Sequence, residues 1–308
     1  MAIGNTSCGI AIPQSFAAPS IDAGVIRRFL PRAEALGYES LWVQEQIIGD
    51  FPILEPVTLL TYAAALTTKP HLGTSVLITV IRNPVQLAKS LASLDQLSHG
   101  RLIAGVGIGG AHVPEAVFGI SGERRARRFV EGLQVMKALW TQPRATMSGE
   151  FWRFEGVAME PKPAQKPHPP LWFGARDATG LRRAARLGDG WMGAGSASSA
   201  DFVKQVGMLR SFLEEAKRDP ETFPISKRVY IAVDAEPARA ERRLRDWFGL
   251  RYRNADMASR VSIWGNRAEC IDKLGELVRA GARHLLFNPV FDEMEHLELL
   301  ASEVIPKI

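Results

Sequence analysis

Short apolar runs alternate with longer amphipathic stretches along most of the chain. The apolar runs predict strands that are buried on both faces, and the amphipathic stretches predict helices that cover them. Strands are predicted at residues 8–12, 39–43, 71–80, 101–108, 171–174, 190–194, 228–233 and 283–288. Helices are predicted at residues 22–36, 56–67, 84–97, 123–140, 177–187 and 199–217, with a terminal helix after the last strand. This alternation indicates parallel βα units.

Two insertions interrupt the alternation. Residues 142–170 contain an aromatic segment at 149–154 and then five prolines between positions 161 and 170, which predicts a short hairpin and an extended connection. Residues 236–264 separate the seventh strand from the eighth. Eight βα units suit a closed barrel, so we expect an α/β fold of the (β/α)8 TIM barrel type. We expect one domain over residues 1–308, with insertions after the fourth and seventh units.

Composition and charge restrict the possible partners. Hydrophobic residues make up 46% of the 308 residues, and 38 Lys and Arg against 33 Asp and Glu give a formal net charge of +5. The dense exception to this mild excess is the cluster Arg124, Arg125, Arg127 and Arg128, which we interpret as a solvated helix face. Because no aromatic-interleaved basic stripe accompanies the cluster, we expect no nucleic-acid partner.

The cysteines and the apolar segments exclude further classes. Cys8 and Cys270 lie near opposite ends of the chain, without the spacing of a disulfide framework or a zinc site. Residues 1–14 lack the basic region and apolar run of a signal peptide, and no stretch approaches the length of a membrane span. We therefore expect a cytoplasmic protein with no metal site and no membrane partner.

Catalytic groups of such barrels lie on the carboxyl-terminal rim, where the strands end. A glycine-rich run, residues 105–110, ends the fourth predicted strand. It lacks the spacing of a dinucleotide-binding fingerprint, and no acidic residue follows on a neighbouring strand, which argues against a Rossmann site. Glycines at a strand end instead permit a flat ring to approach the backbone closely, although a turn that simply requires glycine is the alternative.

Many motifs of one known family recur here in order. They include the run from His71 to Ile78, Asn83-Pro84, Gly100-Arg101-Leu102, residues 169–174 and residues 188–191. On these motifs the chain resembles the luciferase-like flavin and deazaflavin enzymes over most of residues 8–200. The resemblance implies a barrel oxidoreductase that transfers a hydride between coenzyme F420 and a small organic substrate. It also implies a homodimer.

The resemblance further implies which residues hold the cofactor. Residues 75 and 76 match the position of a non-prolyl cis peptide bond that bulges against the deazaflavin; an ordinary β-bulge near Gly73 is the alternative. Residues 174–176 are expected to bind the cofactor phosphate through backbone N–H groups and a guanidinium, or to be a plain helix start capped by Asp177. The arginine cluster could then receive the acidic tail of F420. The full expected set is Ser75, Val76, Gly107, Ile108, Gly109, Gly174, Ala175, Arg176 and Gly193.

Two residues are candidates for catalysis, Glu45 and His112. Glu45 ends the second predicted strand, where many relatives carry an Asp-His pair; here Gln46 replaces the histidine, and an amide cannot act as a general base. Sugar-phosphate dehydrogenases of the family place a Glu where this chain has Gly110, so both departures argue against that activity. A structural role for Glu45 and a surface position for His112 are the alternatives.

Three other functions remain open from the sequence. The first is a reduced-FMN monooxygenase of the same superfamily. The second is a non-catalytic cofactor-binding protein, which the loss of the Asp-His pair permits. The third is a barrel hydrolase without a redox cofactor, against which the lack of a metal or Gly-x-Ser-x-Gly motif argues.

Overall fold

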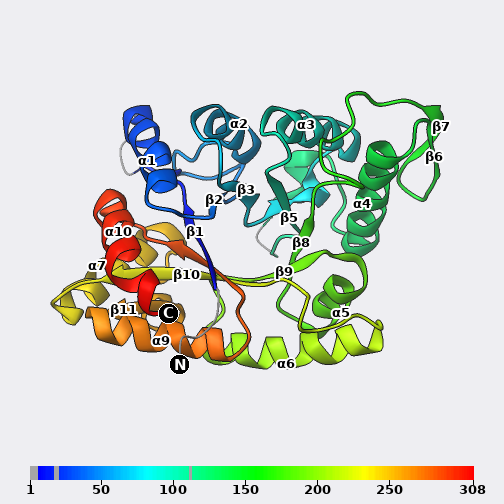
Figure 1. The fold of residues 1–308 in the computed structure, drawn as a ribbon. Coiled ribbons are helices and arrows are strands. Elements are labelled where there is room, and N and C mark those ends of the chain that lie inside the picture. The colour runs from blue at the N-terminus through cyan, green and yellow to red at the C-terminus, as the bar shows by residue number, and fades with distance from the viewer. Residues whose placement is uncertain (1–5, 17–20, 111–112) are drawn as a thin grey trace.

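A computed structural model describes residues 6–16, 21–110 and 113–308 and contains a closed parallel barrel (Figure 1). The barrel strands are β1 (Ser7–Ala11), β2 (Ser40–Val43), β3 (His71–Thr74), β5 (Leu102–Gly107), β8 (Leu171–Gly174), β9 (Gly190–Gly193), β10 (Ile225–Val233) and β12 (His284–Asn288). Consecutive strands of this series pair in parallel, and β12 pairs with β1, which closes the ring. The prediction of an α/β TIM barrel is confirmed.

Helices cover the outside of the barrel (Figure 1). They are α1 (Ala23–Ala35), α2 (Pro56–Leu66), α3 (Pro84–Leu97), α4 (Arg125–Thr141), α5 (Ala178–Leu187), α6 (Ser199–Glu215), α9 (Arg267–Arg279) and α10 (Glu293–Leu299). Local signals fix their starts. The Asn83 side chain accepts hydrogen bonds from two N–H groups of the first turn of α3, and Ser198 and Asp201 form a reciprocal capping box on α6. Because these capping residues are visible in the sequence, the observed helices begin close to the predicted positions.

The barrel interior is a packed core beneath the mouth. Its middle layer consists of Ala11, Trp42, Ile103, Trp172, Met192 and Leu286. Nearer the amino-terminal ends of the strands, the His284 ring lies between two hydroxyls, with Nε2 2.9 Å from Ser40 Oγ and Nδ1 2.7 Å from Ser226 Oγ. Because these layers fill the lower barrel, a ligand can approach the strands from the carboxyl-terminal mouth.

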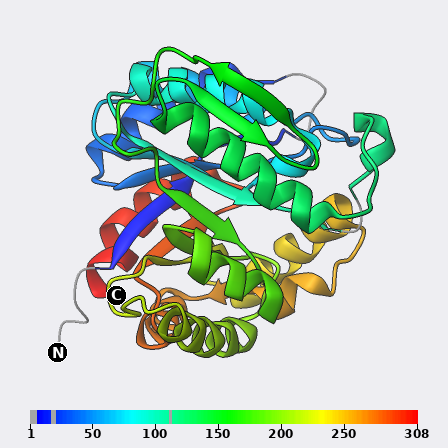
Figure 2. The ribbon, with the colours of Figure 1, turned by 90° about the vertical axis from the view of Figure 1, so that its right-hand side faces the viewer.

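Both insertions are present where they were predicted. β6 (Ala145–Ser148) and β7 (Arg153–Val157) form the hairpin after the fourth unit, outside the helical layer beside α4 (Figure 2). The second insertion contains α7 (Pro237–Tyr252), α8 (Met257–Val261) and β11 (Ser262–Gly265). β11 pairs in parallel with residues 230–233 of β10, so the insertion is attached to the barrel wall.

Two predicted strands differ from the observed ones. The third, predicted over residues 71–80, is interrupted: β3 ends at Thr74, and the chain resumes as β4 (Leu77–Ile78) and η1 (Thr79–Ile81). β4 pairs with β5 rather than extending the pairing of β3 with β2. The seventh strand begins at Ile225, three positions before its predicted start, because three consecutive polar residues at 226–228 belong to it.

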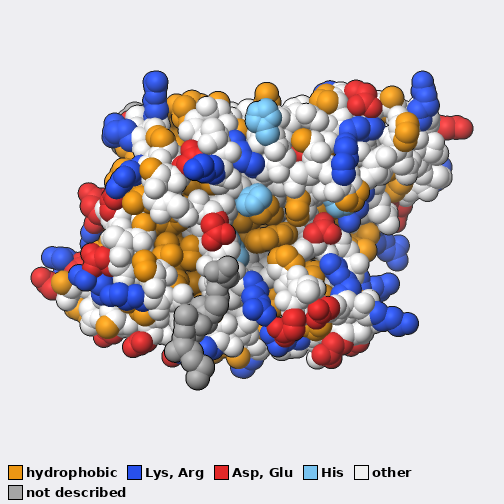
Figure 3. Space-filling model, viewed as in Figure 1, with side chains coloured by type: hydrophobic (Ala, Val, Ile, Leu, Met, Phe, Trp, Pro, Cys, Tyr) orange, Lys and Arg blue, Asp and Glu red, His pale blue; other side chains and the backbone are white. Residues whose placement is uncertain are grey.

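The described surface carries charges of both signs. On the face shown in Figure 3, Lys and Arg side chains are interspersed with Asp and Glu side chains around the outline, and hydrophobic side chains gather nearer the middle. This distribution is consistent with the mild net charge. Among the described residues, no helix combines the length and apolar character that crossing a bilayer requires.

Candidate functional site

The carboxyl-terminal mouth of the barrel divides into two halves. β3, β5, β8 and β9 are consecutive neighbours on one side, and β10, β12, β1 and β2 are consecutive neighbours on the other. The expected cofactor residues lie at or just beyond the ends of the first four strands. A pocket of about 50 Å³ lies in the second half, lined by the segments that follow β1, β2 and β12 and by one end of α7. The mouth thus has two adjacent regions of different composition.

Val76 forms the floor of the first half. The peptide bond between Ser75 and Val76 is cis, as the resemblance implied, and the Val76 side chain packs against the middle layer of the barrel. A Cβ atom at Gly107 would lie 2.7 Å from Val76 Cγ2, and one at Gly174 would lie 3.0 Å from Val76 Cγ1. These glycines therefore make room for the Val76 side chain, which lies in the connection between β3 and β4. The sequence had suggested instead that glycines here let a flat ring approach the backbone.

Glycine is required for different reasons at two other positions of the expected cofactor site. Gly109 has a φ of +80°, which favours glycine, and a Cβ there would also meet Ile78 and Val113. A Cβ at Gly193 would lie 2.8 Å from the Phe202 ring of α6, outside the barrel. Gly193 can consequently present only its backbone to the mouth.

The arginine cluster at the start of α4 is engaged in structural contacts. Arg125 pairs with Glu115 and donates to the Ile108 carbonyl at 2.9 Å, so it holds the end of β5. Arg128 lies 4.8 Å from the centre of the Trp152 ring in the hairpin insertion. Arg124 and Arg127 share the carboxylate of Glu150, at the exposed side of the cluster. The cluster is thus partly a solvated face, and a role in binding an acidic tail stays a prediction.

The turn at residues 174–176 lies beside the loop that follows β9. Arg176 Nη1 donates to Ser196 Oγ at 3.2 Å, and the Gln205 amide donates to the Arg176 carbonyl at 3.2 Å. Asp177 caps α5 by accepting from the Gly180 N–H at 2.9 Å, so the capped helix start that the sequence left as an alternative is present. The guanidinium and the Ser196 hydroxyl together suit an anion, because both can donate to it.

A buried lysine on β10 binds the loop at residues 194–197, which follows β9. Lys227 Nζ donates to the carbonyls of Ala194 at 2.6 Å and Ala197 at 2.9 Å. Burial lowers the pKa of the Lys227 ammonium to about 7. The loop at residues 194–197 is therefore held by contacts on two sides, which positions it without a bound ligand.

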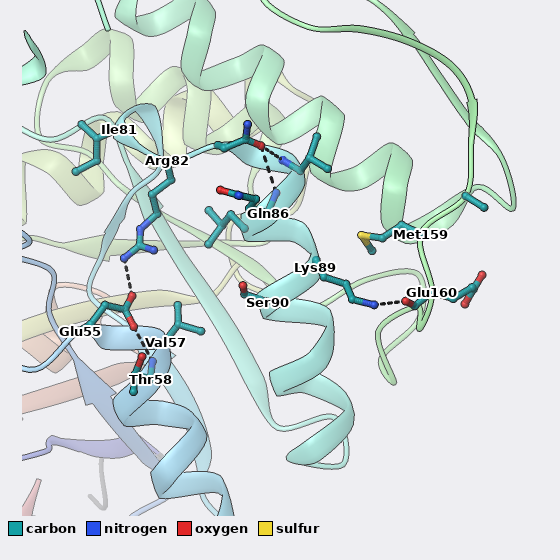
Figure 4. Close-up of a pocket in the computed structure, with 14 residues that line it drawn as sticks. Glu55, Val57, Thr58, Ile81, Arg82, Gln86, Lys89, Ser90, Met159 and Glu160 are labelled. Carbon is teal, nitrogen blue, oxygen red and sulfur yellow. Dashed lines mark hydrogen bonds and ion pairs between the residues drawn. The ribbon is translucent and has the colours of Figure 1, made fainter. Parts of the chain in front are cut away.

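Glu45 is a buried carboxylate with fixed partners. It accepts from the Ile78 N–H and from Arg82 Nε at 2.6 Å, and Arg82 Nη2 also reaches Glu55 at 2.7 Å. Burial raises the pKa of Glu45, and the positive charge of Arg82 opposes that shift. Figure 4 shows Arg82 meeting Glu55, which in turn caps α2 through the Thr58 N–H. The structural role that the sequence left open for Glu45 is thus present. Glu45 also lines the pocket in the mouth.

A hollow larger than the pocket in the mouth lies outside the barrel. A groove of about 940 Å³ runs between the starts of α2 and α3 and the segment at residues 158–160, where Lys89 donates to the Glu160 carbonyl (Figure 4). Arg82 lines this groove, while its partner Glu45 lines the pocket in the mouth. We take the mouth as the candidate active site, because active sites of such barrels form at the carboxyl ends of the strands.

Sequence reasoning missed Arg228 as a residue of the mouth. Its Nε donates to Asn288 Oδ1 at 2.9 Å, and the Gln44 amide donates to the same oxygen at 3.0 Å. The alternation of Ser226, Arg228 and Tyr230 toward the barrel interior is the signal that could have found it. The other catalytic candidate, His112, lies outside the described residues. Among the residues described, no group of three or more His, Cys, Asp or Glu could hold a metal ion.

Comparisons with known proteins agree with this geometry. A family model described as luciferase-like monooxygenase matches residues 7–284. An uncharacterized protein of Mycobacterium tuberculosis is 35% identical over 216 residues, which cover 67% of this chain and 73% of that protein. An F420-dependent glucose-6-phosphate dehydrogenase of Kineococcus radiotolerans is 27% identical over 92% of both chains. The crystal structure of monooxygenase RslO1 from Streptomyces bottropensis superposes with a TM-score of 0.80 at 25% identity, over 97% of this chain and 99% of that one.

Proposed function

Because the chain belongs to the luciferase-like monooxygenase family and is an oxidoreductase, we propose that its cofactor is coenzyme F420 and its substrate a small organic molecule. The bound deazaflavin would supply hydride transfer. The observation that carries the proposal is the divided mouth, with the expected cofactor residues on four neighbouring strand ends and a separate pocket beside them. The likeness to the Kineococcus radiotolerans dehydrogenase supports F420. Gln46 and Gly110 argue against glucose 6-phosphate as the substrate.

The chain's own residues would bind and orient the two reactants. Val76, supported by the two tryptophans of the middle layer, would carry the flat ring on an apolar surface. Arg176 and Ser196 would hold the phosphate, with the adjoining loop kept in place by Lys227. This arrangement would place a substrate in the second half beside the ring and would lower the entropic cost of bringing the two reactants together. Glu45 would act as a positioning residue, because it accepts from the Ile78 backbone N–H and from the Arg82 guanidinium beside the proposed ring site.

A spectral titration tests the cofactor. Oxidised F420 added to the purified chain is expected to show a perturbed absorption spectrum that saturates with micromolar affinity. FMN, titrated separately under the same conditions, is expected to bind at least ten-fold more weakly. Tighter binding of FMN than of F420 would contradict the proposed cofactor and would favour a flavin instead.

Replacement of Arg176 by alanine is expected to weaken F420 binding about ten-fold. The reason is the loss of a charge-assisted contact, on the order of 1.5 kcal/mol, at a turn whose backbone is held by other residues. Arg127→Ala is the matched control, because Arg127 is 74% exposed and lies 3.7 Å from its carboxylate partner. Its effect on affinity should be small and should vanish in high salt. Unchanged affinity of Arg176→Ala would show that the phosphate binds elsewhere.

An FMN-dependent monooxygenase is the second candidate function. It is favoured by the structural likeness to monooxygenase RslO1 at 25% identity. Oxygen consumption with reduced FMN, in a preparation that does not bind F420, would support it. The homodimer and the cytoplasmic location stay predictions.

A further inference from the structure

The insertion helix α7 brings one arginine to the pocket in the second half of the mouth. Arg251, in the last turn of α7, is half-buried and lines the pocket together with Trp247 and Tyr252 of the same helix. Its guanidinium lies 5.3 Å from the centre of the Phe51 ring, in the loop after β2. The helix itself is anchored by Leu244 and Phe248 and by other apolar residues that pack on the upper part of β10. Arg251 is therefore held in place by a packed helix.

A second guanidinium lies nearby. Arg228, on β10, is half-buried, and its Nη2 donates to the Tyr230 hydroxyl at 2.7 Å. That hydroxyl lies 2.6 Å from the hydroxyl of Tyr252, the residue that follows Arg251 in the chain. Burial lowers the pKa of Arg251, and the positive charge of Arg228 acts in the same direction. Arg251 and Tyr252 thus line the pocket, and Arg228 lies behind them, joined to Tyr252 through the Tyr230 hydroxyl.

Neither cation has a carboxylate partner among the described residues. Other arginines of α7 do form ion pairs, in Arg239–Asp234, Arg243–Asp292 and Arg245–Asp256. Two acids line the pocket: Glu45 is already paired with Arg82, and burial raises the pKa of Glu293, which favours its neutral form. Partly desolvated charges without a counterion are costly, so Arg251 in the pocket wall, with the charge of Arg228 acting on it, indicates a site for an anion.

We propose that Arg251, assisted by Arg228, binds a carboxylate group of the substrate, so that this oxidoreductase acts on organic acids. The proposal rests on the proposed function for the reaction, but the binding site does not depend on which cofactor is used. The planar guanidinium of Arg251 has no hydrogen bond to another described residue, and its fork matches a carboxylate in a bidentate pair. Ile53, Trp247 and Val290 line the same pocket and would contact the apolar part of the acid.

Simple aromatic probes test this site on the whole chain saturated with its cofactor. Benzoate is expected to bind at least ten-fold more tightly than benzamide, which has nearly the same shape without the charge, in calorimetric titrations. Arg251→Met is expected to remove this preference, and Arg251→Lys, which keeps the charge without the fork, to retain part of it. Arg242→Met is the control, because Arg242 is exposed on the same helix and lies outside the pocket lining. It should bind benzoate like the parent.

Several outcomes would overturn the proposal. Equal binding of benzoate and benzamide by the parent, or an unchanged preference in both Arg251 variants, would show that no carboxylate site exists there. Binding of phenyl phosphate, with no detectable binding of benzoate, would show that the site prefers a phosphate ester to a carboxylate. If Arg251→Met weakens F420 instead of benzoate, the cations serve the cofactor. Failure of the F420 titration together with a retained benzoate preference would reject the proposed cofactor and leave the carboxylate site standing.

Discussion

Replacement of Arg82 by methionine is expected to lower the free energy of unfolding by about 3 kcal/mol. Removing one partner of a buried ion pair leaves the other charge without compensation, at about 3 to 5 kcal/mol. The Glu45 side chain is fully buried, whereas the Arg82 side chain is 20% exposed, so the lower end of that range applies. Urea denaturation at pH 7, followed by circular dichroism, measures the change.

A second substitution identifies the cause of that loss. The double variant Arg82→Met with Glu45→Gln should recover most of the stability, because a neutral amide at position 45 needs no counterion. Arg32→Met is the matched control: Arg32 and Glu298 form an ion pair with both side chains nearly half exposed, which is worth at most about 1 kcal/mol. If the Arg82 and Arg32 variants lose the same stability, the carboxylate of Glu45 is compensated without Arg82.

Acidification from pH 7 to pH 5 is expected to remove about 2 kcal/mol of stability through His284. Burial lowers the pKa of His284 to about 3, whereas a histidine in the unfolded chain titrates near 6.5. As the pH falls through 6.5, the unfolded chain therefore binds a proton that the native ring does not, and unfolding becomes easier. Carboxylates of the unfolded chain titrate mainly below this window, so they contribute little to the change.

The measurement is a series of urea denaturation curves between pH 7 and pH 5. His284→Gln should show a flatter dependence than the parent, because the amide can bond to the Ser40 and Ser226 hydroxyls without titrating. Part of the slope should persist, since burial also lowers the pKa of His296. Parallel curves for parent and variant would mean that the imidazole is protonated inside the barrel.

The barrel could be predicted because its strands and helices follow local rules. Apolar runs, capping residues and glycines at helix ends all act within a few positions of the chain, so a single sequence displays them. The start of β10 escaped prediction for the opposite reason. Its polar residues Ser226, Lys227 and Arg228 are compatible with a barrel strand because of hydrogen bonds to His284, the 194–197 loop and Asn288. These partners are 30 to 60 positions away or come from another strand, and no local pattern shows them.

The candidate site shows the same contrast between local motifs, which can be read from the sequence, and contacts between distant residues, which cannot. The motif around Ser75 and Val76 could be located from its resemblance to a family, and the structure contains the cis bond there. The pairing of Glu45 with Arg82 could not be inferred, because 37 positions separate the two residues and β3 and β4 lie between them in the chain. Arg251 was missed because it lies in an insertion whose amphipathic pattern does not reveal which part of the barrel it covers.

The two ends of the second insertion lie side by side. Val233, the last residue of β10, is the parallel partner of Gly265, the last residue of β11, so residues 234–265 leave the barrel and return at one place. A segment with adjacent ends can be exchanged between homologous barrels while both junctions keep their spacing. Transplanting it would transfer α7 and its pocket-facing side chains as a unit and leave β3, β5, β8 and β9 untouched. Because the transplanted segment carries Trp247, Arg251 and Tyr252, such chimaeras are expected to differ from the parent in the chemistry of this pocket.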